Sequence, residues 1–151
     1  MKKWLTVVAM ILSLVLTASQ AGALCVGVSK ANLRNGPGTS YEVAWQVFRY
    51  MPLKKVGVSD SGQWYAVEDA DGDVTWIRKD LVTDKYKCAV VSAAEEVNVR
   101  TGPGTKFPKG RMGPAKQYYS FKLLKKQGPW LKVRDEWGGI GWIHRSYMWT
   151  R

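Results

Sequence analysis

The stretch "NLRNGPGT" at Asn32 to Thr39 returns as "NVRTGPGT" at Asn98 to Thr105, 66 residues further along the chain. This offset is longer than a solenoid repeat and close to the size of a small autonomous domain. Other rigid landmarks recur at the same offset, and "QWYAVEDADGDVTWIRKDLV" aligns without a gap on "PWLKVRDEWGGIGWIHRSYM". We infer that the chain contains an internal duplication. The match fades at about residues 44–62 and 111–128, where we expect loops to have diverged.

The first 23 residues have the layout of a secretory signal peptide. A lysine pair opens the segment, an apolar run spans residues 4–16, and the small residues Ala21 and Ala23 come at its end. The apolar run is short for a membrane span. We expect cleavage after Ala23, export to the periplasm or the cell exterior, and no stable membrane span after processing. An uncleaved anchor is the alternative.

The remaining chain predicts two small domains, at residues 24–84 and 85–151. Its net charge is strongly positive, +11 for the full chain and +9 without the lysine pair of the signal peptide. Such a field favours anionic partners, which outside the cytoplasm are envelope polymers or acidic proteins, and we expect no nucleic acid. Scattered lysines also fit a solvated face that only confers solubility. The oligomeric state stays open.

Two cysteines, Cys25 and Cys88, each stand just ahead of a repeat. Export places them in an oxidising compartment, where a disulfide is permitted. A bridge between them would close a long loop and stabilise the protein by about 4 kcal/mol in the chain-entropy model. It would also pin the first strands of both repeats together. Free thiols or an intermolecular link are the alternatives.

Runs rich in Val, Trp, Tyr and Ile alternate with Gly, Pro and Asp-Gly signals, which predicts an all-β fold. Each GPGT copy is expected to end a strand in a type II turn, with positive φ at Gly38 and Gly104. Arg34 and Arg100 stand at the strand end, where a guanidinium can hold loop carbonyls or a carboxylate. We assign a structural role in the turns to Arg34, Gly36, Pro37, Gly38, Arg100, Gly102, Pro103 and Gly104.

A hairpin follows in each repeat, where "WYAVE" and "VTWIR" flank an Asp-Gly turn signal. Placing Glu68 opposite Val74 brings Ala66 opposite Trp76, with Trp64 lying diagonally on the same face. The other face is mostly apolar and is the predicted core; it carries Tyr65, Val67 and Ile77, or Leu131, Val133 and Ile143. The tryptophan face is therefore predicted to be half-exposed.

These segments together resemble the bacterial SH3-like domain family, whose members open with L/V-x-R-x-G-P-G-T and close with a tryptophan hairpin ending in G-W-[IV]. The second repeat matches nearly end to end, whereas in the first Thr75 stands where the family has glycine before the tryptophan. The likeness covers about residues 26–83 and 89–149. It implies two tandem small, strongly bent β-barrels of five or six strands. It also implies a binding or targeting role at the cell envelope, often beside peptidoglycan hydrolases.

Catalytic and metal-binding groups are scarce. His144 is the single histidine, so a Cys-His or Ser-His pair cannot be built in both copies of the duplicated design, and the two thiols are expected in a disulfide. Asp69, Asp71 and Asp73 alternate as in a calcium loop, but the required glycine is absent and the second repeat keeps only two acidic residues. We therefore expect a hairpin turn here, no metal, no cofactor and no enzyme activity.

Binding is the remaining class of function. The tryptophan pairs, extended by the aromatic residues after the GPGT turns, are predicted to line a groove that stacks on sugars or holds a peptide. Trp137, at the second hairpin tip, adds apolar surface. The candidate ligand-binding residues are Tyr41, Trp64, Trp76, Phe107, Trp130, Trp137 and Trp142. Alternatively, these aromatics cap small barrels or seal the interface between the repeats.

The sequence thus predicts an exported, non-enzymatic module that binds an envelope component. Peptidoglycan, its stem peptides or another anionic polymer is the expected ligand, and duplicated sites would add avidity on a polymer. The alternative is a periplasmic protein–protein adaptor, in which the repeats pack on each other and bind a partner protein.

Overall fold

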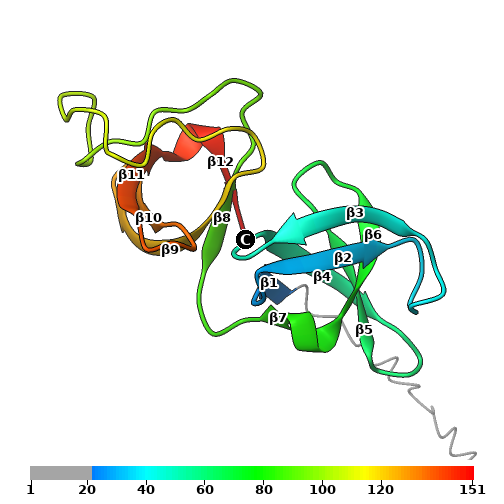
Figure 1. The fold of residues 1–151 in the computed structure, drawn as a ribbon. Helices are drawn as coiled ribbons and strands as arrows, with labels where there is room; N and C mark the ends of the chain where they lie inside the picture. The colour runs from blue at the N-terminus through cyan, green and yellow to red at the C-terminus, as the bar shows by residue number, and fades with distance from the viewer. Residues whose placement is uncertain (1–21) are drawn as a thin grey trace, which may run out of the picture.

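The computed structural model describes residues 22–151, which form two β-sheets without an α-helix (Figure 1). The all-β prediction is confirmed. The predicted signal peptide lies outside the described residues except for Gly22 and Ala23, which begin the first strand. Within residues 22–151, no helix is long and apolar enough to cross a membrane.

The first domain is one antiparallel sheet of seven strands in the order β3-β2-β6-β5-β4-β1-β7. Its strands are β1 (Gly22–Val26), β2 (Lys30–Arg34), β3 (Val43–Phe48), β4 (Pro52–Val58), β5 (Trp64–Glu68), β6 (Val74–Arg78) and β7 (Val82–Thr83). A single 3₁₀ turn, Lys79–Leu81, separates the last two. The strand count exceeds the predicted five or six because β7 adds to the edge of the sheet beside β1. The stretch where the repeats diverge is largely strands β3 and β4 here, not loops.

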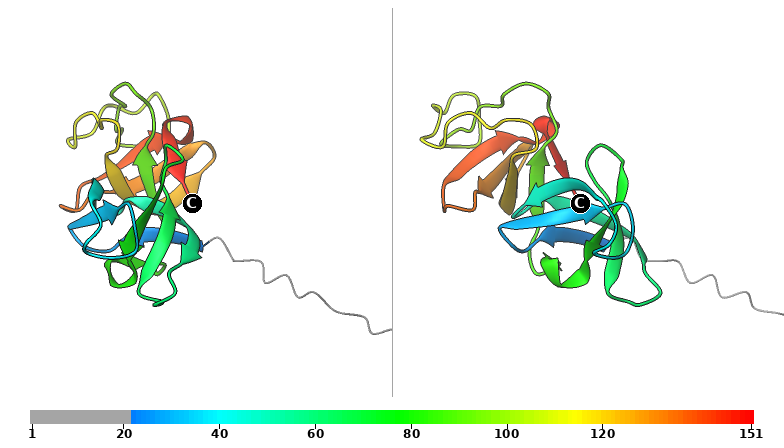
Figure 2. Two further views of the ribbon diagram at one scale, coloured as in Figure 1. Left: turned by 90° about the vertical axis from the view of Figure 1, so that its right-hand side faces the viewer. Right: turned by 45° about the vertical axis from the view of Figure 1, so that its right-hand side comes forward.

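The second domain is a sheet of five strands in the order β11-β10-β9-β8-β12. These are β8 (Cys88–Val91), β9 (Ser120–Gln127), β10 (Trp130–Arg134), β11 (Ile140–His144) and β12 (Met148–Thr150), with a 3₁₀ turn at Arg145–Tyr147 before the last. Residues 92–119 form a long loop with only isolated bridges, seen in yellow-green in Figure 2. Pro108 and Pro114 lie at the two ends of the segment that corresponds to β3, and proline cannot donate to a sheet ladder, so no counterpart of β3 forms. The segment that corresponds to β2 makes only isolated bridges, at Val97 and Arg100.

The tryptophan hairpins have the predicted register, with Ala66 opposite Trp76 and Glu68 opposite Val74. The predicted core face is buried in both repeats, at Val67, Ile77, Leu131, Val133 and Ile143. Tyr65 is only partly buried and packs against the edge of this core. On the tryptophan face, Trp76 and Trp130 are half-buried as predicted, whereas Trp64 and Trp142 are each only 8% exposed. The strand end that carries Arg34 or Arg100 pairs with β6 or β11, at Trp76 or Trp142.

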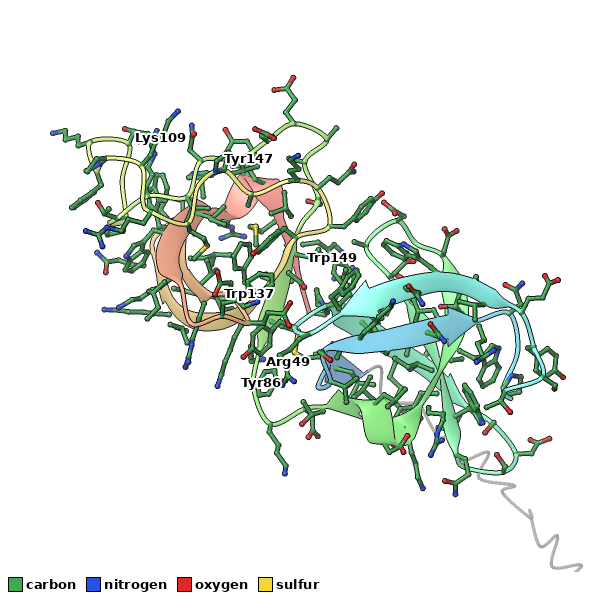
Figure 3. The ribbon with its side chains drawn as sticks, in the orientation of Figure 1. Arg49, Tyr86, Lys109, Trp137, Tyr147 and Trp149 are labelled. Carbon is green, nitrogen blue, oxygen red and sulfur yellow. A yellow bond between two sulfur atoms is a disulfide. The ribbon has the colours of Figure 1, made fainter. Side chains whose placement is uncertain are left out.

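The two domains pack on each other through side chains of the second domain that reach the core of the first. Val90 of β8 belongs to the first domain's buried cluster, and Trp149 of β12 packs against that cluster (Figure 3). The rings of Trp45 and Tyr118 meet edge to face with centroids 5.1 Å apart. Interface sealing by aromatics therefore occurs, but the hairpin tryptophans do not supply it.

The predicted disulfide between Cys25 and Cys88 is present and links β1 to β8. Both cysteines are buried, at 3% and 1% exposure. Since β8 is the first strand of the second domain, the bridge holds that strand against the sheet of the first.

Replacing both cysteines, Cys25→Ala/Cys88→Ala, is expected to lower the free energy of unfolding by about 4 kcal/mol, because the bridge closes a long loop in the unfolded chain. Urea denaturation of oxidised wild type and variant measures the change. A reductant should lower the wild-type midpoint and leave the variant's unchanged. Equal midpoints for the two oxidised proteins would contradict the prediction.

Tyr118 also ties the domains together, because its hydroxyl donates to the Asp71 carboxylate over 2.8 Å. That hydrogen bond raises the pKa of Tyr118 above its ordinary value of 10.0. A pKa raised on folding contributes stability that is present below pH 10 and is lost as the pH rises through the folded value. We expect Tyr118→Phe to be less stable than wild type at pH 8, with the difference shrinking above pH 10.

Thermal unfolding across that pH range measures the difference, and tyrosinate absorbance should lose one late-titrating group in the variant. Tyr147→Phe, on the exposed side of the second domain, is the matched control. A constant stability difference across the alkaline range would contradict the role of this hydrogen bond.

Candidate functional site

The GPGT loops are not type II turns, since neither Gly38 nor Gly104 has a positive φ. Instead the N–H of Gly38 donates to the carbonyl of Gly36 over 2.9 Å, and Gly104 repeats the bond to Gly102 at 3.0 Å. This i to i+2 bond makes a γ-turn centred on proline, whose fixed φ suits that position. The type II prediction is wrong because it read the second glycine as a positive-φ position.

The first glycine of each GPGT copy makes room for an aromatic ring. A Cβ on Gly36 would come within 2.6 Å of Tyr41 Cγ, and a Cβ on Gly102 would collide in the same way with Phe107. Both rings therefore lie flat on their own loop. The sequence had predicted that these rings extend a tryptophan groove, but neither ring lines one of the grooves described below.

The motif arginine holds each loop closed. Arg34 Nη1 donates to the Tyr41 carbonyl over 2.7 Å. Arg100 Nη1 donates to the Phe107 carbonyl over 2.8 Å and to the Thr105 carbonyl over 3.2 Å. In each loop the guanidinium thus donates hydrogen bonds to backbone carbonyl groups, and the same arginine lines the groove described below.

An aspartate closes each hairpin turn. Asp69 Oδ1 accepts from the N–H groups of Asp71 and Asp73, both at 3.0 Å, and Asp135 Oδ1 accepts from two N–H groups in the equivalent turn. Burial raises the pKa of Asp69, and its two N–H donors oppose that rise. Across residues 22–151, no group of three or more His, Cys, Asp or Glu side chains could hold a metal ion.

Each domain carries a groove beside its hairpin. Groove 1 has a volume of about 390 Å³ and is lined by Lys30, Ala31, Asn32, Arg34, Thr39, Gln46, Trp64, Arg78 and Leu81. Groove 2 has a volume of about 620 Å³ and is lined by Ala93, Ala94, Glu95, Glu96, Val97, Asn98, Arg100, Thr105, Trp130, His144, Ser146 and Tyr147. Eight lining positions of groove 1 recur in groove 2 at the 66-residue offset, so the two grooves are one site in two copies.

The two copies differ in charge. Groove 1 is lined by the cations Lys30, Arg34 and Arg78 and by no carboxylate. Groove 2 places two carboxylates, Glu95 and Glu96, beside one arginine. The change from lysine to glutamate falls at corresponding positions, 30 and 96. The same backbone site is therefore lined by cations in one domain and by carboxylates with an arginine in the other. In groove 1, Arg78 is paired with Asp80 and Arg34 with the Tyr41 carbonyl, which leaves Lys30 as the cation without a partner among the described residues.

Groove 2 also has the larger aromatic wall. The His144 ring meets Trp130 edge to face at 5.3 Å and lies 6.1 Å from the Tyr147 ring. His144 Nδ1 lies 2.7 Å from Ser146 Oγ and accepts from the Ser146 N–H, so it caps the short 3₁₀ turn. No counterpart of this ring series lines groove 1, where Arg78 and Leu81 take the two positions.

The structure separates the predicted ligand-binding residues. Trp64 and Trp130 line the grooves, Trp76 and Trp142 line neither, and Trp137 lines a cleft between the domains. Sequence reasoning missed several lining residues, Asn32, Asn98, Thr39, Thr105, Arg78, Leu81 and Tyr147. The two Asn and two Thr residues stand inside the repeated motif itself, where their identity in both copies was an available signal.

Gly36→Ala is expected to lower the free energy of unfolding by roughly 1–3 kcal/mol, because the new methyl group must displace the Tyr41 ring. Gly38→Ala is the matched control, since a Cβ there would approach no atom closer than 3.4 Å. Urea denaturation compares the two variants. Adding Tyr41→Ser to Gly36→Ala should recover part of the loss; equal effects of the two glycine variants would contradict the ring-on-glycine contact.

Comparison with known proteins identifies the repeats. Family models described as bacterial SH3 domain match residues 27–84 and residues 95–148. The chain is 26% identical over 150 residues to the Bacillus subtilis protein named "Putative N-acetylmuramoyl-L-alanine amidase YrvJ", covering 87% of this chain. It spans about a quarter of that relative's length, 26%.

Two solved structures match the chain at low sequence identity and low TM-score. An NlpC/P60 family protein from Bacillus cereus has a TM-score of 0.39 at 12% identity, covering 86% of this chain and 56% of its own. The endolysin LysPBC5 CBD has a TM-score of 0.35 at 16% identity, covering 86% of this chain and 93% of its own. With a family model matching each repeat, the chain belongs to the bacterial SH3 domain family and carries two such domains in tandem.

Proposed function

We propose that this chain is a cell-wall binding module whose two grooves hold peptidoglycan stem peptides. One observation carries the proposal: the same groove, with eight corresponding lining positions and a tryptophan in its wall, is built once in each domain. Two equivalent sites on one chain suit a ligand that itself repeats, because binding of the first site raises the local ligand concentration for the second.

The groove chemistry fits a short peptide rather than a flat polymer surface. In groove 1 the Lys30 ammonium offers donors to a carboxylate, while Arg78 is already paired with Asp80 through Nε and Nη2. The Asn32 amide nitrogen can donate to a peptide carbonyl, since its oxygen already accepts from Gln46. In groove 2, Glu95 and Glu96 suit an amine. A stem peptide presents carboxylate, amide and amine groups close together, so each groove would select a different part of it.

The similarity to the amidase named for N-acetylmuramoyl-L-alanine, a peptidoglycan unit, supports a wall ligand. In this proposal the chain itself binds without catalysis. Both cysteines are consumed in the disulfide, and His144 caps its own 3₁₀ turn through Ser146.

The proposal places the protein outside the cytoplasm, in the periplasm or beyond. A buried disulfide fits an oxidising compartment. The positive net charge would attract the chain to anionic wall polymers before the grooves engage.

A second candidate is the protein–protein adaptor, because the domains pack on each other as that hypothesis requires. Val90 and Trp149 of the second domain join the first domain's core, which presents the pair as one unit to a partner. Envelope proteins would then replace peptidoglycan as the ligand.

Retention of the mature protein on purified insoluble peptidoglycan tests the proposal. The double variant Lys30→Ala/Tyr147→Ala alters one exposed side chain in each groove, and its apparent affinity is expected to fall by roughly tenfold or more, because avidity is lost. The matched control, Lys125→Ala/Ile140→Ala, makes the same charge change and removes an exposed apolar side chain outside both grooves.

Wild-type and control retention should persist at high salt. Retention that salt abolishes equally in every variant would reduce the interaction to a basic protein on an anionic polymer and would contradict the proposal. The absence of any retention would favour the adaptor. Trp64 and Trp142 are poor choices for this test, since they are more than nine-tenths buried and their removal would disturb folding.

A further inference from the structure

A third cavity, the interdomain cleft, lies where the two domains meet and has a volume of about 520 Å³. Trp45, Phe48 and Arg49 line it from the first domain, and Tyr118, Tyr119 and Trp137 line it from the second. Figure 3 shows Arg49 and Trp137 on the two domains that border it. The volume falls in the usual range of ligand pockets, roughly 300–1,000 Å³.

The walls of the interdomain cleft are aromatic and partly open to solvent. Trp137 is 75% exposed and Phe48 is 49% exposed, although both border the same cavity. The Tyr119 ring supports this wall, with its centroid 6.3 Å from that of Trp137 and 5.0 Å from that of Phe121. An exposed tryptophan beside a second exposed ring presents a stacking surface that the folded chain does not use itself.

Trp137 breaks the symmetry of the duplication. Its counterpart in the first repeat is Asp71, whose carboxylate accepts the Tyr118 hydroxyl and so helps to hold the domains together. One hairpin tip thus serves the interface and the other presents an aromatic ring at the cleft. The interdomain cleft therefore exists once per chain, whereas the grooves exist twice.

The charges within the interdomain cleft balance, in contrast to the strongly basic chain around it. Among the residues that line the cleft, Arg49 and Glu136 are the only charged ones. Arg49 Nη1 donates to the Gly27 carbonyl over 3.0 Å. The Gln117 amide adds both a donor and an acceptor at the rim. Aromatic faces with an amide and a carboxylate, and no excess charge, fit a ligand that has apolar C–H faces and hydroxyl groups.

We propose that the interdomain cleft binds an uncharged segment of the wall's glycan strand, with sugar rings stacked on Trp137 and Phe48 and hydroxyls bonded to Gln117 and Glu136. This inference rests on the proposed wall-binding function and adds a glycan site to the two peptide grooves. Glycan and stem peptide are joined in the same polymer, so one protein molecule would bind both.

The interdomain cleft is held open before a ligand arrives. Ser120 Oγ donates to the Arg49 carbonyl over 2.7 Å, which joins one wall to the other. The edge-to-face contact of Trp45 with Tyr118 and the disulfide add two further ties between the domains. A preorganised cleft binds more tightly because less ordering remains to be done on binding.

Isothermal titration calorimetry of the full chain with the β-1,4-linked N-acetylglucosamine tetramer tests the proposal. We expect one tetramer per chain. Trp137→Ala should weaken binding by about five- to tenfold, as loss of one aromatic stacking contact predicts, and Phe48→Ala should act in the same direction. Trp137→Phe should retain most of the affinity. Ile140→Ala, an exposed apolar change on the same hairpin outside the cleft, should leave binding unchanged.

The outcomes separate this inference from the proposed function. Retention on peptidoglycan without tetramer binding would overturn the glycan site and leave wall binding standing. Two tetramers per chain, with binding weakened by Tyr147→Ala instead, would move the sugar into the grooves and overturn the inference. Tetramer binding that Trp137→Ala and Phe48→Ala leave intact, with both variants folded by circular dichroism, would also overturn it.

Discussion

Strand β8 is the constraint on which the rest of this molecule depends, because it is buried on both faces. Side chains alternate along a strand, so successive residues of β8 point to opposite sides. Val90 enters the core of the first domain and Val91 enters the core of the second. Cys88, on the same side as Val90, is bonded to Cys25. One short strand thus contributes side chains to both cores, and it holds the two domains at a fixed distance from each other.

This arrangement explains why the interdomain cleft and the grooves differ in kind. The grooves lie within single domains and are built from the repeated motif, so duplication copied them together with their Asn, Arg, Thr and Trp residues. The cleft needs side chains from both domains, and its rings come from positions where the repeats have diverged, such as Trp45 and Trp137. Copying produced the paired sites, and divergence at the boundary produced the single one.

Much of the fold could be predicted from the sequence. The 66-residue offset, the alternation of apolar residues and the Asp-Gly turn located both hairpins, their register and their buried face, because these depend on neighbours close in the chain. The candidate site was predicted only in part. Tyr41 and Phe107 were assigned to a ligand groove, yet each ring lies on a glycine of its own loop. A glycine beside a proline has two physical explanations, positive φ or lack of space for a Cβ, and the sequence alone does not show that the second applies here, to the glycine before the proline.

The sequence by itself determined the duplication, the all-β class and the face of each hairpin that enters the core, because strand periodicity places alternate residues on one face. It did not show that Trp64 and Trp142, on the other face, are also buried. Only the tertiary structure decided which tryptophans line a groove and where Trp137 lies. It also decided the contacts between the domains. Ser120 donates to the Arg49 carbonyl, and Tyr118 contacts both Asp71 and Trp45. These contacts join residues 47 to 73 positions apart, and they form only when the two sheets pack together. The pattern within either repeat specifies its own sheet and carries no information about that docking.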